Sequence, residues 1–280
     1  MQIRHRGLVT VALLAPAIVL ISAVLIWPLL DFVSRSFRDP GGAFVFYARL
    51  AELSIYFQVL MRTLGVSAAT AFICLLIGYP VAYKLATAKP LGKALILACV
   101  LLPFWTNLLV RSYGWILILN PQGIINSALL ELGLISAPLD IVYNFLGVLI
   151  GMSQIMLPYF ILPLYAVMTK LDPQYANAAR TLGARPLRTF MSVYFPLTLP
   201  GVMAGLLLVF TISLGFFVIP AMLGGAGGLL LAQMIEFNVN TSLNWGMASA
   251  LSTSLLAATL VLYVIGDRWL NLGAIWGLQR

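Results

Sequence analysis

Residues 141–200 read IVYNFLGVLIGMSQIMLPYFILPLYAVMTKLDPQYANAARTLGARPLRTFMSVYFPLTLP, and this stretch decides the fold. It begins with an apolar run, continues through a polar segment with four basic residues, and ends at the start of a second apolar run. A helix that crosses the hydrocarbon core of a bilayer needs about 20 predominantly apolar residues, and the first run is long enough to provide them. The pattern predicts two membrane-spanning helices joined by a polar loop.

The composition of the whole chain supports a membrane protein. Hydrophobic residues make up 62% of the 280 residues and charged residues only 9%, with a mean hydropathy of +1.03. Soluble domains carry about 25% charged residues, so this chain has too few to cover a water-exposed surface. The net charge of +8 does not indicate nucleic-acid binding, because the cations lie between apolar runs rather than in one basic cluster. Membrane lipid is the expected surrounding, and nucleic acid is not an expected partner.

Similar apolar runs recur along the chain and predict an all-α membrane protein with six transmembrane helices. The first run is longer than the 7–15-residue core of a signal peptide, so we expect an uncleaved first span. No segment between the runs has the composition of a separate domain, and we expect a single transmembrane domain over residues 1–280. The expected spans are 8–30, 64–85, 94–119, 141–168, 199–223 and 247–266.

The distribution of cations predicts the orientation. Cytoplasmic loops of membrane proteins are enriched in Lys and Arg. Most of the sixteen Lys and Arg residues fall at the two termini and in the loops 86–93 and 169–198. Both termini and these two loops are therefore expected to be cytoplasmic. These cations are Arg4, Arg6, Lys84, Lys89, Lys93, Lys170, Arg180, Arg185, Arg188, Arg268 and Arg280.

Two segments are expected on the opposite, outer side. Residues 31–62 are mixed and aromatic, which suits the headgroup level of the membrane, where aromatic side chains are enriched. Residues 120–140 read as a turn followed by a short amphipathic helix.

The loop 169–198 contains signals that start and stop helices. Asp172 can cap the N-terminus of a helix that has Pro173 at its first position, and Gly183 can end this helix in the left-handed conformation. Pro186 can open a second helix. The loop is therefore expected to form two short helices joined at Gly183.

The second of these helices carries an apolar stripe, because Leu187, Phe190, Met191 and Tyr194 are spaced at i, i+3, i+4 and i+7. An exposed amphipathic element needs a partner protein or the membrane surface. The residues alone favour neither of these two interpretations.

The same loop resembles the EAA loop of binding-protein-dependent ABC importer permeases. Asn177-Ala178-Ala179, Gly183 and Phe195-Pro196 occupy the places of that family's Glu-Ala-Ala, Gly and apolar-proline turn. The resemblance implies that the loop is a coupling helix that docks on the ATP-hydrolysing subunit. Asn177 stands where the family has an acidic residue, and an uncharged amide makes a weaker hydrogen bond than a carboxylate. The residues implied in coupling are Tyr175, Ala176, Asn177, Ala178, Ala179, Leu182, Gly183 and Arg185.

The resemblance also implies partners and a location. The partners are an ATP-binding-cassette ATPase dimer, a second homologous permease subunit and a periplasmic solute-binding protein, and the location is the bacterial inner membrane. ATP and Mg would be held by the ATPase and no cofactor by this chain, which is expected not to be an enzyme. The nearest approach to a phosphate-binding loop, Gly92-Lys93-Ala94, lacks the first glycine and the final Ser or Thr. Cys74 and Cys99 have no metal-ligand spacing, so no metal site is expected.

The third span is interrupted by a proline, polar groups and an arginine at 103–115. An arginine within the membrane is a functional-site hypothesis by default, although Arg111 can also extend from near the outer end to the headgroups. This segment resembles the spermidine/putrescine-type branch of the family, as do Leu157-Pro158-Tyr159 and the stretch from Phe217 to Gly225. The resemblance implies a substrate path between two permeases. The candidate path residues are Trp105, Asn107, Arg111, Tyr113, Trp115, Phe216 and Phe217.

The substrate and the mode of energy coupling have alternatives. The interiors of the six expected spans hold no Asp or Glu for a polyamine, although aromatic faces can attract a cation. A zwitterionic or anionic solute, such as an amino acid, an opine or an organophosphonate, remains an alternative to putrescine or spermidine. An ion-coupled secondary transporter is less favoured, because such proteins use intramembrane carboxylates or repeated halves. Gly201 and Gly205 form a G-x-x-x-G that can pack against the second permease or be a chance occurrence.

Overall fold

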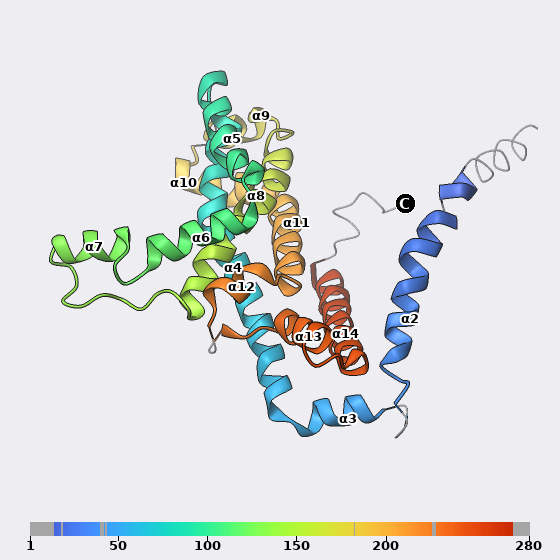
Figure 1. Ribbon diagram of the computed structural model, residues 1–280. Helices are drawn as coiled ribbons and strands as arrows, with labels where there is room; N and C mark the ends of the chain where they lie inside the picture. Colours follow the sequence, from blue (N-terminus) through green and yellow to red (C-terminus); the bar gives the residue numbers. More distant parts are fainter. Residues whose placement is uncertain are drawn as a thin grey trace, which may run out of the picture. The chain divides into compact units, whose positions relative to one another are not determined.

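The computed structural model describes residues 14–17, 19–39, 42, 44–181, 183–225 and 228–270 (Figure 1). Every regular element in these ranges is a helix, and none of the described residues forms a strand. The chain divides into two compact units. One comprises residues 1–57 with 234–258, and the other comprises residues 58–233 with 259–280. The predicted Arg4, Arg6, Leu182 and Arg280 lie outside the described residues.

Five helices in the described ranges are long and apolar enough to cross a membrane. A sixth span results if the bent pair Pro90–Trp105 and Leu108–Glu131 crosses as one element, and the two parts of this pair meet at 103°. The expectation of six spans therefore agrees with the structure only when the third span is broken. The five helices are Leu14–Arg35, Ser54–Thr87, Phe145–Met168, Pro186–Leu214 and Trp245–Val264.

The core of the second unit is built by α4 (Ser54–Thr87), α8 (Phe145–Met168) and α11 (Phe195–Leu214). Phe160 of α8 is fully buried, and its ring lies against Gly78 of α4 and Gly205 of α11. A methyl group on Gly78 would lie 2.6 Å from the Phe160 ring, and one on Gly205 would lie 2.8 Å from it. The missing side chains of these glycines therefore let three helices pack closely, as small residues do in membrane interfaces.

The Gly201 and Gly205 pair packs within the chain. A methyl group on Gly201 would lie 3.0 Å from Val167 Cβ and 3.1 Å from Leu164 Cα, both on α8. Of the two alternatives for this pair, packing against a second permease or chance, neither describes the close contact with α8 of the same chain. The spacing itself predicts close helix packing, but it does not specify which helix is the neighbour.

The fifth span begins earlier than the sequence predicted. The segments α10 (Pro186–Thr189), η2 (Phe190–Tyr194) and α11 form one continuous helix from Pro186, where a helix was expected to open, so no helix starts at residue 199 and Phe195-Pro196 forms no turn. In η2 the Phe195 N–H donates to the Phe190 carbonyl, five residues back, as in a π-helix. Such local adjustments let a membrane helix continue through Pro196 and Pro200.

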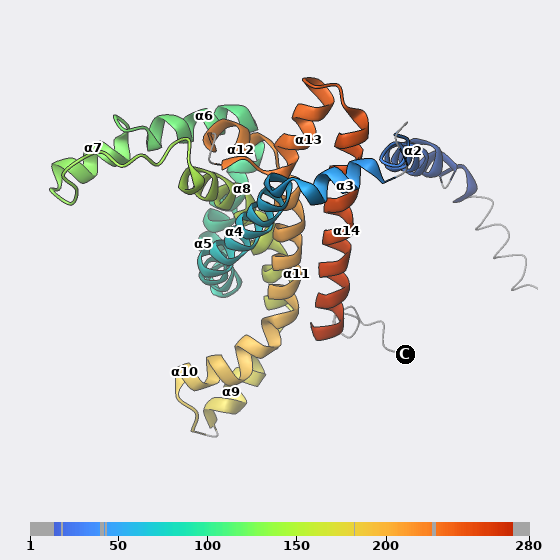
Figure 2. The same ribbon diagram turned by 90° about the horizontal axis from the view of Figure 1, so that it is seen from below.

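The third span is divided into α5 (Pro90–Trp105) and α6 (Leu108–Leu119), and a short helix, α7 (Ile124–Glu131), follows α6. In both Figures 1 and 2, α6 and α7 form an arm that extends away from α8 and α11. The helix α12 (Val218–Leu223) packs against α6 and α8, at the base of this arm. The turn and short helix expected within 120–140 are confirmed by α7.

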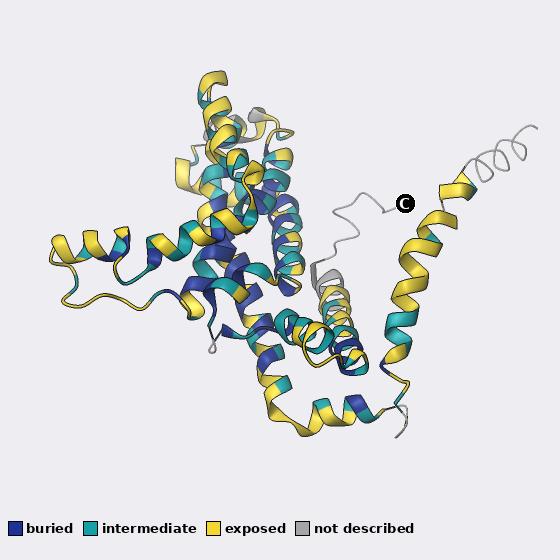
Figure 3. Cartoon of the chain, in the orientation of Figure 1, coloured by how far each residue is buried: buried dark blue, intermediate teal, exposed yellow. Residues whose placement is uncertain are grey.

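The first unit contains η1 (Ser22–Ile26), α2 (Trp27–Arg35) and α3 (Val45–Glu52), with most of α13 (Leu231–Asn240) and the first half of α14 (Trp245–Leu270). The Ser249 hydroxyl donates a hydrogen bond to the Phe32 carbonyl, which joins α14 to α2. Arg35 forms an ion pair of 2.9 Å with Asp31, and its guanidinium lies 5.8 Å from the ring centroid of Trp245. The apolar side chains of α2 are largely exposed (Figure 3), which is the surface expected of a helix in contact with lipid or another subunit.

Candidate functional site

The segment after α8 forms the short helix α9 (Pro173–Thr181) with the predicted start and stop signals. The Gln174 N–H donates to Asp172 Oδ1 at 2.8 Å, so Asp172 caps the N-terminus of α9. Gly183 has φ +81°, and the Ala184 N–H donates to the Ala179 carbonyl at 3.1 Å to close the end of the helix. Both predictions are confirmed, and we call residues 172–194 the coupling segment.

The coupling segment offers an exposed surface. The Tyr175 side chain is 59% exposed, and Ala178, Gly183 and Arg185 are also exposed, whereas Ala179 is half-buried. The side chains of Ala176 and Asn177 lie outside the described part of the chain, as does Leu182. The predicted coupling residues therefore share one short helix and the turn after it, and those described are largely exposed (Figure 3).

The predicted apolar stripe is divided between two surroundings. Leu187 and Met191 are exposed. The Phe190 ring is 5.9 Å from Tyr79 of α4, and the Tyr194 ring is 5.3 Å from Tyr83 of the same helix, measured between ring centroids. One half of the stripe therefore packs against α4, and the other half is exposed.

A hydrogen bond strengthens this connection between α4 and α11. The hydroxyls of Tyr79 and Thr198 are 2.9 Å apart, and Thr198 also donates to the Phe195 carbonyl at 2.8 Å. Sequence reasoning missed Tyr79 and Tyr83. Their spacing of four residues near the polar end of α4 places them on one helix face and is the signal that was available.

The break between α5 and α6 is held by two of the candidate path residues. Asn107 Oδ1 accepts from the Leu109 N–H at 2.8 Å and caps the N-terminus of α6. Arg111 Nη1 donates to the Pro103 carbonyl at 2.7 Å, which satisfies a backbone acceptor at the end of α5. Arg111 thus bridges the two helices at the 103° bend.

The other candidate path residues differ in their surroundings. Trp105 is 89% exposed and Tyr113 is 62% exposed on this chain, whereas Phe216 is partly buried against the core. Trp115 Nε1 donates to Gln154 Oε1 of α8 at 3.4 Å. Phe217 precedes α12, which packs against α6.

Asn126 is a further structural residue that the sequence did not reveal. It is fully buried in α7, where its amide nitrogen donates to the carbonyls of Asn120 and Leu139, each at 3.0 Å. Asn126 Oδ1 accepts from the Leu139 N–H at 2.7 Å. One side chain therefore fixes the loop between α6 and α8. A single Asn inside a short amphipathic helix carries no sequence signal for such a role.

The long apolar helices of the described ranges and the broken third span indicate an integral membrane protein. Residues 75–272 match the sequence profile of the family described as "Binding-protein-dependent transport system inner membrane component". The chain belongs to this family and is an integral inner-membrane permease subunit of the ABC-importer class.

Related sequences agree with this assignment. The chain is 41% identical over 220 residues to the spermidine/putrescine transport system permease protein PotB of Haemophilus influenzae, covering 78% of this chain and 77% of that protein. It is 37% identical over 228 residues to the corresponding protein of Escherichia coli, covering 80% and 82%. It is 28% identical over 228 residues to a putative 2-aminoethylphosphonate transport system permease protein of Salmonella paratyphi A, covering 80% and 78%.

Solved structures agree with the fold. A bacterial ABC transporter involved in the import of the acidic polysaccharide alginate is similar with a TM-score of 0.74 at 16% identity, over 95% of this chain and 96% of that one. A complex of the alginate transporter with its pentasaccharide-bound periplasmic protein gives a TM-score of 0.70 at 15% identity, over 94% of both chains. At these identities the likeness concerns the fold alone.

Proposed function

We propose that this permease couples ATP hydrolysis on a separate ATPase dimer to the import of a polyamine such as putrescine or spermidine. The coupling segment docks on the ATPase, which holds ATP and Mg. A periplasmic binding protein delivers the solute to the outer side, and the path runs between this chain and a second homologous permease. The helices alternate between inward-facing and outward-facing arrangements.

One observation carries the coupling role: the exposed segment is mechanically continuous with two membrane helices. Beyond the turn at Gly183, α10, η2 and α11 form a single helix of 29 residues. The rings of Phe190 and Tyr194, together with the hydrogen bond between Tyr79 and Thr198, join the N-terminal half of this helix to α4. A displacement of α9 by the ATPase is therefore transmitted to α11 and α4 together.

The arrangement of cations supports a cytoplasmic position for the coupling segment. The contact between Tyr83 and Phe190 brings the C-terminal end of α4, with Lys84, to the same end of the unit as Arg185 and Arg188. A shared end rich in cations fits the cytoplasmic side under the positive-inside rule. Both termini then lie in the cytoplasm, since an even number of spans separates them.

The exposure of the broken third span supports a path shared with a second permease. Trp105 and Tyr113 are large aromatic residues that stay exposed on the isolated chain, next to the bend that Arg111 holds. Aromatic faces attract organic ammonium groups, and the attraction reaches about 2 kcal/mol when the pair is desolvated. The second permease is the expected cover for this surface.

Polyamine is the proposed substrate because the relatives with the higher identities are named for spermidine and putrescine. A zwitterionic or anionic solute is the second candidate, which the relative named for 2-aminoethylphosphonate supports. Thermal unfolding of the cognate binding protein distinguishes the two. Stabilisation by putrescine or spermidine is expected, whereas stabilisation by an organophosphonate or amino acid alone would replace the polyamine by the second candidate.

Gly183→Val tests the coupling role. A β-branched residue disfavours the left-handed conformation at φ +81°, where a non-glycine residue already costs about 1–2 kcal/mol. We expect ATP hydrolysis to continue while transport per ATP falls severalfold, because the turn that positions α9 is distorted.

Gly133→Val is the matched control, since Gly133 also has a positive φ, +68°, and both glycines have open space for a side chain. Gly133 follows α7, away from the coupling segment, so this variant should keep the normal ratio of transport to ATP hydrolysis. Equal ratios in the two variants would contradict the coupling role of α9.

A further inference from the structure

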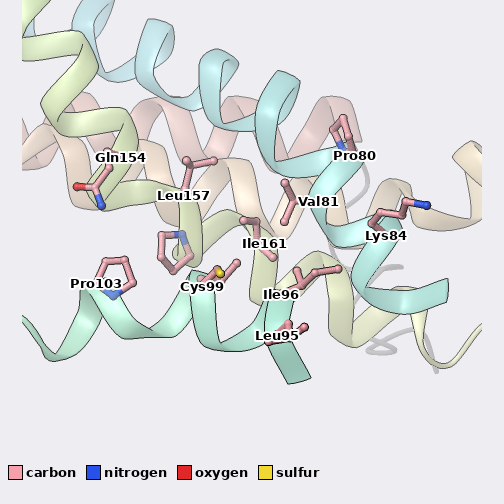
Figure 4. Close-up of a pocket in the computed structure, with 12 residues that line it drawn as sticks. Pro80, Val81, Lys84, Leu95, Ile96, Cys99, Pro103, Gln154, Leu157 and Ile161 are labelled. Atoms are coloured by element: carbon pink, nitrogen blue, oxygen red, sulfur yellow. The ribbon is translucent and has the colours of Figure 1, made fainter. Parts of the chain in front are cut away.

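A cavity of about 650 Å³ lies between α4, α5 and α8, within the second unit. Its walls are almost entirely apolar, and it opens to the surface of the chain. Figure 4 shows Lys84 at one end of the lined region and Gln154 at the other, with side chains such as Ile96, Cys99 and Leu157 between them. None of the candidate coupling or path residues lines this cavity.

The length of the cavity matches one leaflet of a bilayer. Its lining runs along α5 from Leu95 to Pro103, which at 1.5 Å per residue is about 12 Å. Half of a typical hydrocarbon core is about 15 Å thick. The groove is therefore long enough to hold most of one acyl chain that runs parallel to the helices.

The charge around the cavity favours an anionic headgroup. Lys84 lines one end of the cavity. Lys89 directly precedes α5, and Lys93 lies in the first turn of that helix. Of these three lysines, Lys84 lines the groove. Lys93 does not line it, and its Nζ lies 5.0 Å from the ring centroid of Tyr165. The three helices that form the cavity carry no Asp or Glu. No carboxylate on these helices opposes the binding of a phosphate at Lys84.

Gln154 is the polar side chain that lines the other end of the cavity. Gln154 Oε1 already accepts the hydrogen bond of Trp115 Nε1, and Pro103 beside it has a carbonyl that accepts from Arg111. Because the residues around Gln154 that line this end, such as Pro103 and Leu157, are apolar, this end is suited to the methyl end of a chain. An apolar chain is favoured there by about 0.8 kcal/mol for each methylene group removed from water.

We infer that this groove binds one acyl chain of an anionic phospholipid, with the lipid phosphate at Lys84. The lipid fills the space between α4, α5 and α8 and contacts Pro103, which precedes the break in the third span. Lys84 lies at the end of α4 that the proposed orientation places on the cytoplasmic side, so that orientation assigns the lipid to the cytoplasmic leaflet. The binding itself does not depend on the orientation.

The test uses the assembled transporter, purified in mild detergent and reconstituted with a phosphatidylglycerol that carries a diazirine near the end of one acyl chain. After illumination, mass spectrometry of peptides locates the adducts. We expect adducts on α5 and α8 near Cys99 and Leu157, competed by unlabelled phosphatidylglycerol and far less by phosphatidylethanolamine. Lys84→Gln should lower the yield about fivefold, which is the effect of one cation on anionic lipid binding. Lys170→Gln removes a nearby cation that does not line the groove and should leave the yield unchanged.

A second pair of variants tests the groove rather than the charge. Cys99→Trp fills the cavity and should abolish these adducts, whereas Ala98→Trp places the same ring at a neighbouring exposed position outside the lining and should keep them. Equal adduct yields with both lipids, adducts spread evenly over all exposed helices, or a second permease occupying the groove would each overturn the inference. Recovery of the ATPase with each variant reports separately on the proposed importer function.

Discussion

Replacing Gly205 by alanine places a methyl group 2.8 Å from the Phe160 ring and 3.0 Å from the Phe160 carbonyl. The carbonyl belongs to the backbone of α8, so side-chain rotation alone does not remove the conflict, and α11 must move away from α8. Overpacking of this kind costs about 1–3 kcal/mol. The better helix propensity of alanine offsets up to about 1 kcal/mol of this cost.

Gly65→Ala is the matched control, because a methyl group on Gly65 of α4 meets no atom within 4 Å. This control keeps the gain in helix propensity and lacks the clash. The free energy of unfolding, measured by denaturant titration of the purified chain in mild detergent, should be lower for Gly205→Ala than for Gly65→Ala by about 1–3 kcal/mol. Adding Phe160→Leu to Gly205→Ala should recover part of the loss. Equal stability of the two alanine variants would refute the close packing of α8 against α11.

Three further results are expected. Arg111→Gln should lower the free energy of unfolding by about 1.5–3 kcal/mol, because it removes a charged donor from the Pro103 carbonyl. An unchanged free energy of unfolding together with lost transport would instead favour a role of Arg111 in the path. Asn126→Ala should accelerate hydrogen exchange throughout residues 120–139 while global unfolding changes little, since the hydrogen bonds that it removes are local; unaltered exchange would contradict its anchoring role. Tyr79→Phe removes the hydroxyl that meets Thr198 but keeps the ring, and should lower transport per ATP with normal assembly, which an unchanged ratio would disprove.

The boundaries within the coupling segment were predictable because they depend on single residues. Asp172 has a short acceptor side chain and Gly183 has no Cβ, and each determines the local backbone almost alone. The structure confirms both positions. The start of the fifth span was not predictable in this way. Phe195-Pro196 reads as a boundary in sequence, yet the helix that begins at Pro186 contains a π-turn and continues through Pro196 and Pro200.

The contacts between helices were least accessible from sequence. The spacing of Gly201 and Gly205 indicates a close helix neighbour but does not distinguish α8 of the same chain from a second subunit. The sequence indicates that Arg111 is a charged residue within the membrane. It does not indicate the hydrogen bond from Arg111 to the Pro103 carbonyl, because this bond depends on the 103° bend between α5 and α6. Such contacts arise from tertiary packing and have no local pattern. The residues of the coupling segment alone favoured neither a partner protein nor the membrane surface as its contact. The hypothesis that it docks on an ATPase came from the resemblance to a known family.

Polyamine uptake into proteoliposomes tests whether a complex that contains this permease imports its solute with energy from ATP. The assembled complex would be reconstituted with its binding protein, and the entry of labelled putrescine and spermidine followed over time. We expect uptake that requires both ATP and the binding protein and that fails when this chain is omitted. Uptake driven by a proton or sodium gradient without ATP would contradict it.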